Sequence, residues 1–341
     1  MQRMSPYSPP SSGRQGKLRL DFNENTVGAS PRVAEFLKKR LTAESLSVYP
    51  EYQEARPVLA SYFRVSPEQL LLTNGTDEAI QVLINTYVDD GDEVVVLDPS
   101  YAMYRFYAEL AGGVVKQVRY LGADLQFPLD GVLEAITPAT RAVLIANPNN
   151  PTGTGVGLDG LERILKRARK AAVLVDEAYF EFCGVTALGM MPDQPNLFVS
   201  RTFSKIYGMA AMRMGCLISQ AGNLWYLRKG QSPYSVNMLA ALAAQAAVED
   251  SGYIERYVTE VLAGRELMCV ELERMGIGYV PSQANFVLVR FGKRAIEVRD
   301  KLREKGVLVR DRSYELAGCV RVTVGTREQT RRFLAALKEI W

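Results

Sequence analysis

Short apolar runs recur along the first two thirds of the chain, and helical patterns separate many of them. The runs are four or five residues long and apolar on both faces, at residues 70–73, 93–97, 142–146, 172–175, 197–200 and 214–218. Helical patterns lie between several of them, for example at 77–88 and 158–171. Strands that are apolar on both faces suit a parallel sheet that helices cover. The alternation therefore predicts a layered α/β domain.

The last third of the chain has a different pattern. An alanine-rich helical pattern runs from about Asn237 to about Met275, with a break near Gly252. Strand-like runs follow at 285–290 and 320–324, and helical patterns at 294–305 and 327–340 flank the second of these runs. We expect four parts: a flexible N-terminal arm at 1–16, an N-terminal segment at 17–45 that packs with the small domain, a large domain at 46–240 and a smaller α+β domain at 241–341.

The composition excludes several classes of function. The chain has 341 residues, 48% of them hydrophobic, and a formal net charge of +3. That balance gives no reason to expect a nucleic acid or an anionic membrane as partner. No apolar stretch reaches membrane-spanning length, and residues 1–17 lack the apolar core of a signal peptide. We therefore expect a cytoplasmic protein.

The chain contains no histidine and only four cysteines. The absence of histidine excludes Ser-His-Asp and Cys-His nucleophile systems, and also His-ligated metal sites. The cysteines form no Cys-x-x-Cys pair and fit no zinc or disulfide framework. We expect no metal site, and acid–base chemistry must come from Lys, Tyr, Asp, Glu, Cys or a cofactor.

Polar clusters follow four of the apolar runs, where an open α/β sheet binds its ligands. In chain order they are Asn74-Gly75-Thr76-Asp77-Glu78, Asn147-Pro148-Asn149-Asn150-Pro151-Thr152-Gly153, Asp176-Glu177-Ala178-Tyr179 and Arg201-Thr202-Phe203-Ser204-Lys205, with Arg213 eight residues beyond Lys205. Each cluster alone is explained equally well by a tight turn, a helix cap or an exposed lysine. Four of them in this order, at successive strand ends, indicate a ligand site.

As a set, these segments resemble the signature of fold-type-I aminotransferases that depend on pyridoxal 5'-phosphate (PLP). The similarity is greatest to the histidinol-phosphate aminotransferase family. Further matching segments lie at 21–25, 98–104 and 321–326, and the resemblance covers the chain from about residue 18 to its end. It implies the aspartate-aminotransferase-like fold, with a mostly parallel sheet in a large PLP-binding α/β domain and a smaller α+β domain. It also implies a PLP-dependent aminotransferase of histidine biosynthesis.

The resemblance implies a role for individual residues around the cofactor. Lys205 would hold PLP as a Schiff base and, once freed, would move a proton between the substrate carbon and the cofactor carbon. Asp176 would keep the pyridine nitrogen protonated, so that the ring acts as an electron sink. Tyr179 and Asn150 would hydrogen-bond the ring oxygen, and Tyr101 would stack on the ring.

The phosphate of PLP requires hydrogen-bond donors and positive charge. A helix start supplies amides and a favourable dipole, and side chains add hydroxyls and a guanidinium group. The expected phosphate ligands are Gly75, Thr76, Asp77, Thr202, Ser204 and Arg213. By the same resemblance, Tyr49 would reach the phosphate of the neighbouring subunit, so that a homodimer shares its active sites.

Arg321 is the expected anion clamp for the substrate, with Asn23 and Arg310 as further substrate contacts. In the family, the Asn-Glu-Asn segment usually continues with Pro, an aromatic residue and Gly, whereas this chain has Thr26-Val27-Gly28. The missing phenolic contact leaves two amino donors open: L-histidinol phosphate, with 2-oxoglutarate as the amino acceptor, or an aromatic amino acid such as phenylalanine.

Two other functions use the same fold. A PLP decarboxylase resembling threonine-phosphate decarboxylase is an alternative, because the same cofactor-binding residues support it. A regulator that keeps the PLP fold as a sensor domain carries an added N-terminal DNA-binding module. Only about twenty residues precede the first family motif here, which is too few for a helix-turn-helix domain, so this function is not expected.

Overall fold

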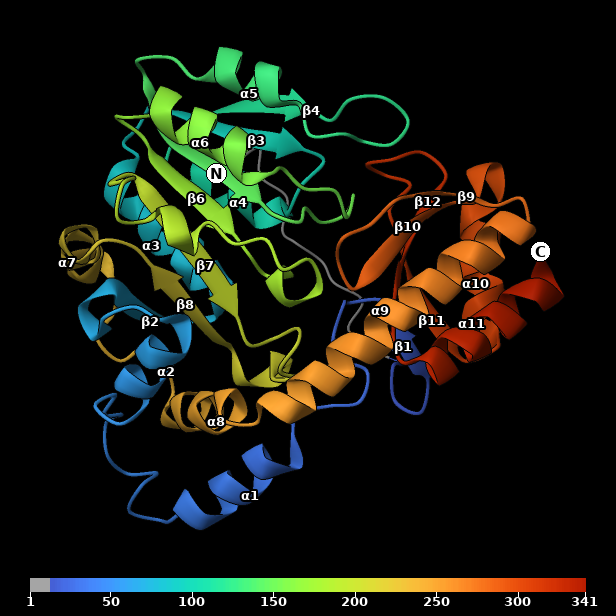
Figure 1. Ribbon diagram of the computed structural model, residues 1–341, viewed down its shortest axis with the longest axis horizontal. Coiled ribbons are helices and arrows are strands. Elements are labelled where there is room, and N and C mark those ends of the chain that lie inside the picture. Colours follow the sequence, from blue (N-terminus) through green and yellow to red (C-terminus); the bar gives the residue numbers. More distant parts are fainter. Residues whose placement is uncertain (1–12) are drawn as a thin grey trace.

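The six apolar runs all form strands of one seven-stranded sheet in the computed structural model, which describes residues 13–341 (Figure 1). The sheet order is β2-β8-β7-β6-β5-β3-β4. Its strands are β2 (Leu70–Asn74), β3 (Glu93–Asp98), β4 (Val114–Arg119), β5 (Thr140–Ala146), β6 (Ala172–Asp176), β7 (Leu197–Thr202) and β8 (Met214–Ile218). The predicted α/β class is confirmed.

Helices cover both faces of this sheet, because its central strands are apolar on both sides. Val94 and Val96 of β3 pack in the core on one face, and Val95 and Leu97 pack in the core on the other. The first face is covered by α3 (Gly75–Tyr87), α4 (Ala102–Leu110) and α7 (Ala221–Gly230). The second face is covered by α2 (Ala55–Phe63), α5 (Leu129–Ala135), α6 (Leu158–Arg167) and α8 (Met238–Val248).

The sheet is mostly parallel, but β8 is an exception. The run at 214–218 was expected among the parallel strands, and this is wrong: β8 pairs antiparallel with both β7 and β2. The reason is the length of the connection. Residues 203–213 join β7 to β8, which is too short for a crossover between parallel strands. The chain therefore turns back at the end of β7, and this return loop carries Ser204, Lys205 and Arg213.

A second, five-stranded sheet forms the smaller domain, with the order β1-β11-β12-β10-β9. Its strands are β1 (Leu18–Leu20), β9 (Gly278–Val280), β10 (Phe286–Arg290), β11 (Val307–Asp311) and β12 (Cys319–Thr323). Three helices pack with it, α9 (Ser251–Arg274), α10 (Ala295–Glu304) and α11 (Arg327–Ile340). β1 pairs parallel with β11, so the N-terminal segment joins the C-terminal sheet.

The N-terminal segment divides between the two domains. β1 belongs to the small sheet, whereas α1 (Pro31–Arg40) packs on α8 below the large sheet in the view of Figure 1. The expected boundary at 240/241 would fall inside α8, which also packs on α2. We propose that the division lies between α8 and the long helix α9, which runs from the base of the large domain along the small one (Figure 1).

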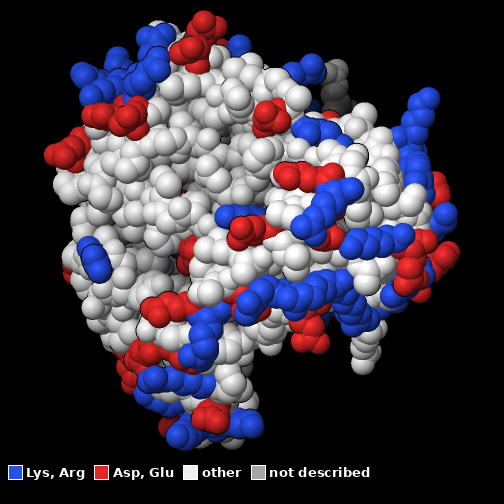
Figure 2. All heavy atoms as spheres, turned by 45° about the vertical axis from the view of Figure 1, so that its right-hand side comes forward, with Lys and Arg blue, Asp and Glu red and all other residues white. Residues whose placement is uncertain are grey.

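Residues 1–12 of the expected flexible arm lie outside the described residues. Five short 3-10 turns complete the description: Pro67–Gln69, Phe180–Phe182, Leu188–Met190, Ala210–Met212 and Gly292–Arg294. On the face shown in Figure 2, Lys and Arg side chains lie close to Asp and Glu side chains. Within residues 13–341, no helix is both long and apolar enough to cross a membrane.

Candidate active site

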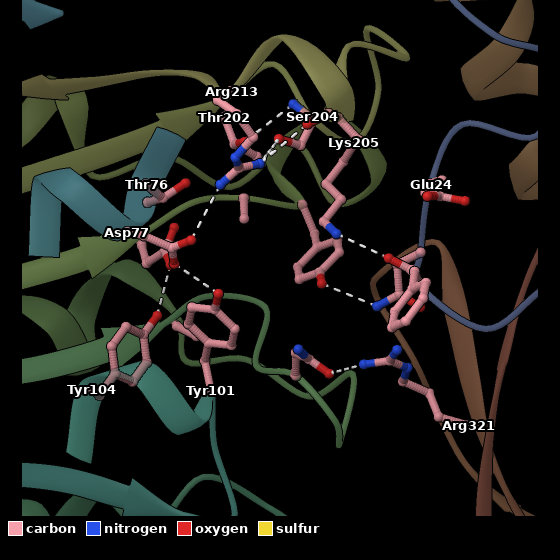
Figure 3. A pocket seen from close by; sticks show the side chains of 18 residues that line it. Glu24, Thr76, Asp77, Tyr101, Tyr104, Thr202, Ser204, Lys205, Arg213 and Arg321 are labelled. Carbon is pink, nitrogen blue, oxygen red and sulfur yellow. Dashed lines mark hydrogen bonds and ion pairs between the residues drawn. The ribbon is translucent and has the colours of Figure 1, made fainter. Parts of the chain in front are cut away.

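A cavity of about 320 Å³ lies where the C-terminal ends of β5, β6 and β7 meet the small domain. These strands contribute Ala146, Asp176 and Thr202 to its wall. Most of the residues that the sequence singles out converge on this cavity (Figure 3). Those that line it are Asn23, Thr76, Asp77, Tyr101, Asn150, Asp176, Tyr179, Thr202, Ser204, Lys205, Arg213 and Arg321.

One end of the cavity is suited to an anion. Thr76 and Asp77 lie in the first turn of α3, where backbone amides have no partner within the helix. Arg213 comes from the return loop, pairs with Asp77 Oδ2 at 3.1 Å and donates to Ser204 Oγ at 3.4 Å. Thr202 lies beside them on the wall (Figure 3). Amides, hydroxyls and one guanidinium group therefore surround this end.

Two glycines allow this close packing. Gly75 has φ +72°, and a Cβ atom there would lie 2.6 Å from Nη2 of Arg213. A Cβ atom on Gly215 of β8 would lie 2.7 Å from the carbonyl carbon of Gly75. Gly75 does not itself line the cavity, but its missing side chain lets Arg213 approach the start of α3.

Lys205 extends into the cavity from the wall opposite Tyr101 (Figure 3). Its Nζ donates to the carbonyl oxygen of Phe22 at 3.0 Å. Burial, together with the positive charges of Arg321 and Arg213, lowers the pKa of Lys205 to about 8, although the negative charge of Glu24 opposes the decrease. An appreciable fraction of this amine is therefore neutral near pH 7, as a nucleophile requires.

Asp176 forms the floor of the cavity together with a residue that the sequence reasoning missed. The hydroxyl of Tyr104 donates to Asp176 Oδ2 at 2.7 Å. The other oxygen, Oδ1, is buried and has no well-formed hydrogen bond among residues 13–341. Burial raises the pKa of Asp176 to about 6, and the hydroxyls of Tyr104 and Ser200 oppose this increase. Tyr104 lies one helical turn after Tyr101, a spacing that signals a shared face.

Ring and amide groups complete the walls. The hydroxyl of Tyr101 donates to Asp77 Oδ1 at 2.7 Å, which holds its ring beside the cavity. The hydroxyl of Tyr179 accepts a hydrogen bond from Nδ2 of Asn23 at 3.0 Å. Asn150 Oδ1 accepts a hydrogen bond from Nη1 of Arg321, which links the large domain to β12 of the small one.

A buried ion pair lies behind the floor. Arg201 Nη2 lies 2.7 Å from Glu177 Oε2, and both side chains are almost fully buried. Arg201 precedes Thr202 in β7, and Glu177 follows Asp176 after β6. The pair therefore joins the ends of two strands whose neighbouring residues line the cavity. Removal of Arg201 would leave the buried carboxylate of Glu177 without its cation, which is strongly destabilising.

Two expected site residues lie away from the cavity of this chain. Tyr49 is 73% exposed, and its ring stacks on that of Tyr234 with 4.4 Å between ring centres. Arg310 of β11 lies opposite Arg321 of β12 in the strand register. Its guanidinium carbon is 5.5 Å from the ring centre of Phe22, a cavity residue that the sequence reasoning also missed.

The position that departs from the family pattern also lies elsewhere. Val27 does not line the cavity, and its side chain is 48% exposed. Val27 therefore contributes no contact to the wall of this chain's cavity.

The residues present fit PLP. The orphaned Oδ1 of Asp176 suits a protonated pyridine nitrogen, because a buried acceptor requires a donor. The anion-binding end suits a phosphate, and the amine of Lys205 reaches the same cavity. Among the described residues, no group of three or more acidic or cysteine side chains is arranged to hold a metal ion.

Comparison with known proteins identifies relatives of the whole chain. Residues 15–337 match the family model described as aminotransferase class I and II. The histidinol-phosphate aminotransferase of Symbiobacterium thermophilum is 39% identical, over 99% of this chain and 96% of its own length.

Two solved structures are similar over nearly the whole chain. The histidinol-phosphate aminotransferase of Sinorhizobium meliloti in complex with PLP superposes with a TM-score of 0.85 and 26% identity, covering 100% of this chain and 98% of its own. A single mutant of Thermus thermophilus aspartate aminotransferase has a TM-score of 0.83 and 26% identity, covering 96% and 93%.

Proposed function

Because the chain belongs to the class I and II aminotransferases, and within them to the histidinol-phosphate aminotransferase family, we propose that it transfers an amino group from L-histidinol phosphate to 2-oxoglutarate. Its fold is that of aspartate aminotransferase, and its cofactor is PLP. When bound, PLP supplies an electron sink for the electrons of the substrate carbon that loses its proton. The chain itself must hold the cofactor, orient the donor and move that proton.

Each of these tasks has a residue suited to it. Lys205 would hold the cofactor covalently and then carry the proton, because it is the only lysine among the described residues that line the cavity. Asp176 would keep the pyridine nitrogen protonated through Oδ1, while Tyr104 holds Oδ2. Tyr179 and Asn150 would hydrogen-bond the ring oxygen, and Tyr101 would stack on the ring.

The phosphate of PLP would lie at the anion-binding end described above. Its ligands would be the amides of the first turn of α3, the hydroxyls of Thr202 and Ser204, and the guanidinium group of Arg213. Asp77 serves through its backbone amide, because its carboxylate already accepts from Arg213 and Tyr101.

The observation that supports histidinol phosphate as the donor is that two arginines lie opposite each other on neighbouring strands. Arg321 reaches the cavity wall across from Lys205, and Arg310 lies directly opposite it on the neighbouring strand. Arg321 supplies a guanidinium group at the cavity wall, and Arg310, which does not line the cavity, adds a second positive charge on the same face of the sheet. Together they suit a phosphate monoester, whose charge approaches −2 at neutral pH. A phenylalanine side chain offers no charge to them. Asn23 would contact the donor near the same wall.

The donor is tested by a half-reaction that needs no acceptor. The purified, PLP-loaded protein is mixed with L-histidinol phosphate or with L-phenylalanine, and the loss of the visible absorption band of the bound cofactor is followed. We expect conversion at least about a hundred-fold faster with histidinol phosphate, because its phosphate engages the arginines. Faster conversion with phenylalanine would instead assign the protein as an aromatic amino-acid aminotransferase.

We also propose a homodimer whose subunits share their active sites, with the amino donor and the 2-oxo acid as the small-molecule partners. Tyr49 supports this, because it lies outside the cavity of its own chain and is largely exposed. Leu46 and Val48 beside it are also exposed, at 64% and 59%. An exposed apolar segment of this kind suits a subunit interface.

Tyr49→Phe removes only the phenolic hydroxyl, so it tests the contact to the partner's phosphate. We expect the PLP dissociation constant to rise about five- to ten-fold while the protein stays dimeric. The measurements are cofactor titration and light scattering after size exclusion. Tyr226→Phe is the matched control, since Tyr226 is also largely exposed but lies on α7 rather than beside Tyr49. A monomeric protein that binds PLP fully would contradict the proposal.

A further inference from the structure

The segment Asp21–Asn25 crosses between the two domains, and we call it the strap. The backbone amide of Asn23 donates to Thr323 Oγ1 of the small domain at 3.0 Å. At the far end of the strap, Asn25 Nδ2 donates to the carbonyl oxygen of Ile206 in the return loop at 2.8 Å. Phe22, Asn23 and Glu24 line the cavity. The strap is thus a wall of the site that both domains hold.

Arg14 is bound to the strap on both sides of Phe22. Its Nε and Nη2 donate to the two carboxylate oxygens of Asp21, at 3.0 and 2.9 Å. Nη1 and Nη2 also donate to the carboxylate of Glu24, at 3.2 and 2.7 Å. Its guanidinium carbon lies 4.4 Å from the ring centre of Phe22. Paired contacts of this kind fix both the orientation and the position of the strap relative to Arg14.

Phe22 connects this cluster to the reacting amine. Its carbonyl oxygen accepts the hydrogen bond from Lys205 Nζ, and its ring forms part of the cavity wall. The ring has Arg310 as its other cationic neighbour, at 5.5 Å. A shift of Phe22 would therefore move a wall of the site and an acceptor of Lys205 together.

The positive charge of Arg14 also offsets the negative charge of Glu24. Glu24 is a carboxylate on the wall of a cavity whose substrates, under the proposed function, are a phosphate ester and a dicarboxylic 2-oxo acid. An uncompensated carboxylate there would repel both. Among the described residues, Arg14 is the closer of the two ion-pair partners of Glu24, since the other, Arg19, is 4.0 Å away and half exposed.

We propose that Arg14 is a positioning residue of the substrate pocket, which fixes the strap through Asp21 and Phe22 and neutralises Glu24 so that anionic substrates can enter. The proposal rests on the proposed function for the identity of those substrates. Arg14 itself touches neither the cavity centre nor the reacting atoms.

Arg14→Gln is the direct test, made on the full-length, PLP-loaded protein. We expect the KM values for histidinol phosphate and 2-oxoglutarate to rise roughly five- to ten-fold, with kcat changed less than about two-fold. Arg32→Gln is the matched control, because Arg32 forms a similar ion pair with Glu249 at 2.9 Å, away from the cavity. We expect its KM values to match those of the unmodified protein.

A pH titration of the visible absorption band provides a readout that needs no substrate. In the free Lys205 amine, the charges of Arg321 and Arg213 lower the pKa, and those of Glu24 and Asp77 raise it. The same charges act on the Lys205 nitrogen when it is joined to the cofactor, and the absorption band reports the protonation of that nitrogen. Loss of Arg14 leaves Glu24 with only the half-exposed Arg19, so the midpoint of the titration should move to higher pH in Arg14→Gln, by about half a pH unit. The double variant Arg14→Gln with Glu24→Gln should restore the midpoint and the part of the KM increase that charge causes, while the part caused by the lost contacts to Asp21 should remain.

These outcomes separate a charge effect from a loss of structure. Unchanged KM values in Arg14→Gln, or an increase that comes without the pH change, would overturn the proposal, and so would a titration midpoint that the double variant does not restore. Should Arg14→Gln fail to fold, Glu24→Gln alone tests the same charge, and its titration midpoint should move to lower pH. Because the titration uses no donor, it remains decisive for Arg14 even if histidinol phosphate is not the substrate.

Discussion

Replacing Lys205 by alanine is expected to abolish transamination, with a loss of at least about a thousand-fold, and to remove the covalent link to the cofactor. The reason is that one amine has both roles, so the variant loses the group that holds PLP and also the base that moves the proton. Cofactor phosphate contacts through Arg213 and the start of α3 remain, so PLP should still bind without covalent attachment. Borohydride reduction followed by peptide mass analysis measures the link.

A lysine of a different environment serves as the control. Lys116 on β4 pairs with Glu93 at 3.1 Å and lies away from the cavity. Lys116→Ala should keep full activity and the same labelled peptide as the unmodified protein. Turnover retained in Lys205→Ala, or a label found on another lysine, would overturn the assignment of Lys205.

Asp176→Asn is expected to reduce the rate of the donor half-reaction by roughly two to three orders of magnitude. An amide cannot keep the pyridine nitrogen protonated, so the ring loses its capacity to accept electrons. The amide oxygen can still accept the hydrogen bond from Tyr104, so the floor of the cavity should stay intact. Rapid-mixing absorbance gives the rate, and circular dichroism shows whether the fold is kept.

The matched control is Asp130→Asn, because the Asp130 carboxylate is 84% exposed on α5. It should leave the half-reaction rate unchanged. A rate within about two-fold of the unmodified protein in Asp176→Asn would show that Asp176 is not the partner of the pyridine nitrogen.

The central strands can be predicted from the sequence because strands that are buried on both faces consist mostly of apolar residues. Strands β3, β5, β6 and β7 are apolar on both faces and are buried on both faces. The edge strand β4 is largely exposed and carries Lys116 and Arg119, so it has no such run. β1 and β9 have only three residues each, too few for any periodicity to be read.

Site residues that follow a strand can be predicted from the sequence, whereas site residues held by contacts between distant segments cannot. Asp176, Thr202 and Lys205 could be located because each follows an apolar run. Arg14 was placed in the flexible arm, because nothing in the neighbouring sequence predicts its ion pairs with Asp21 and Glu24. Tyr49 stays a prediction, because one chain alone does not contain the phosphate it would reach.

The pairing of β1 with β11 bears on how the protein is made. Leu18 pairs with Val307, and Asn23 contacts Thr323 across 300 residues of chain. On the ribosome, all seven strands of the large sheet have been synthesised once residue 218 has emerged, so this sheet is able to form first. The strap has to wait for β11 and β12. The wall of the active site that the strap forms can therefore be completed only after nearly the whole chain has been synthesised.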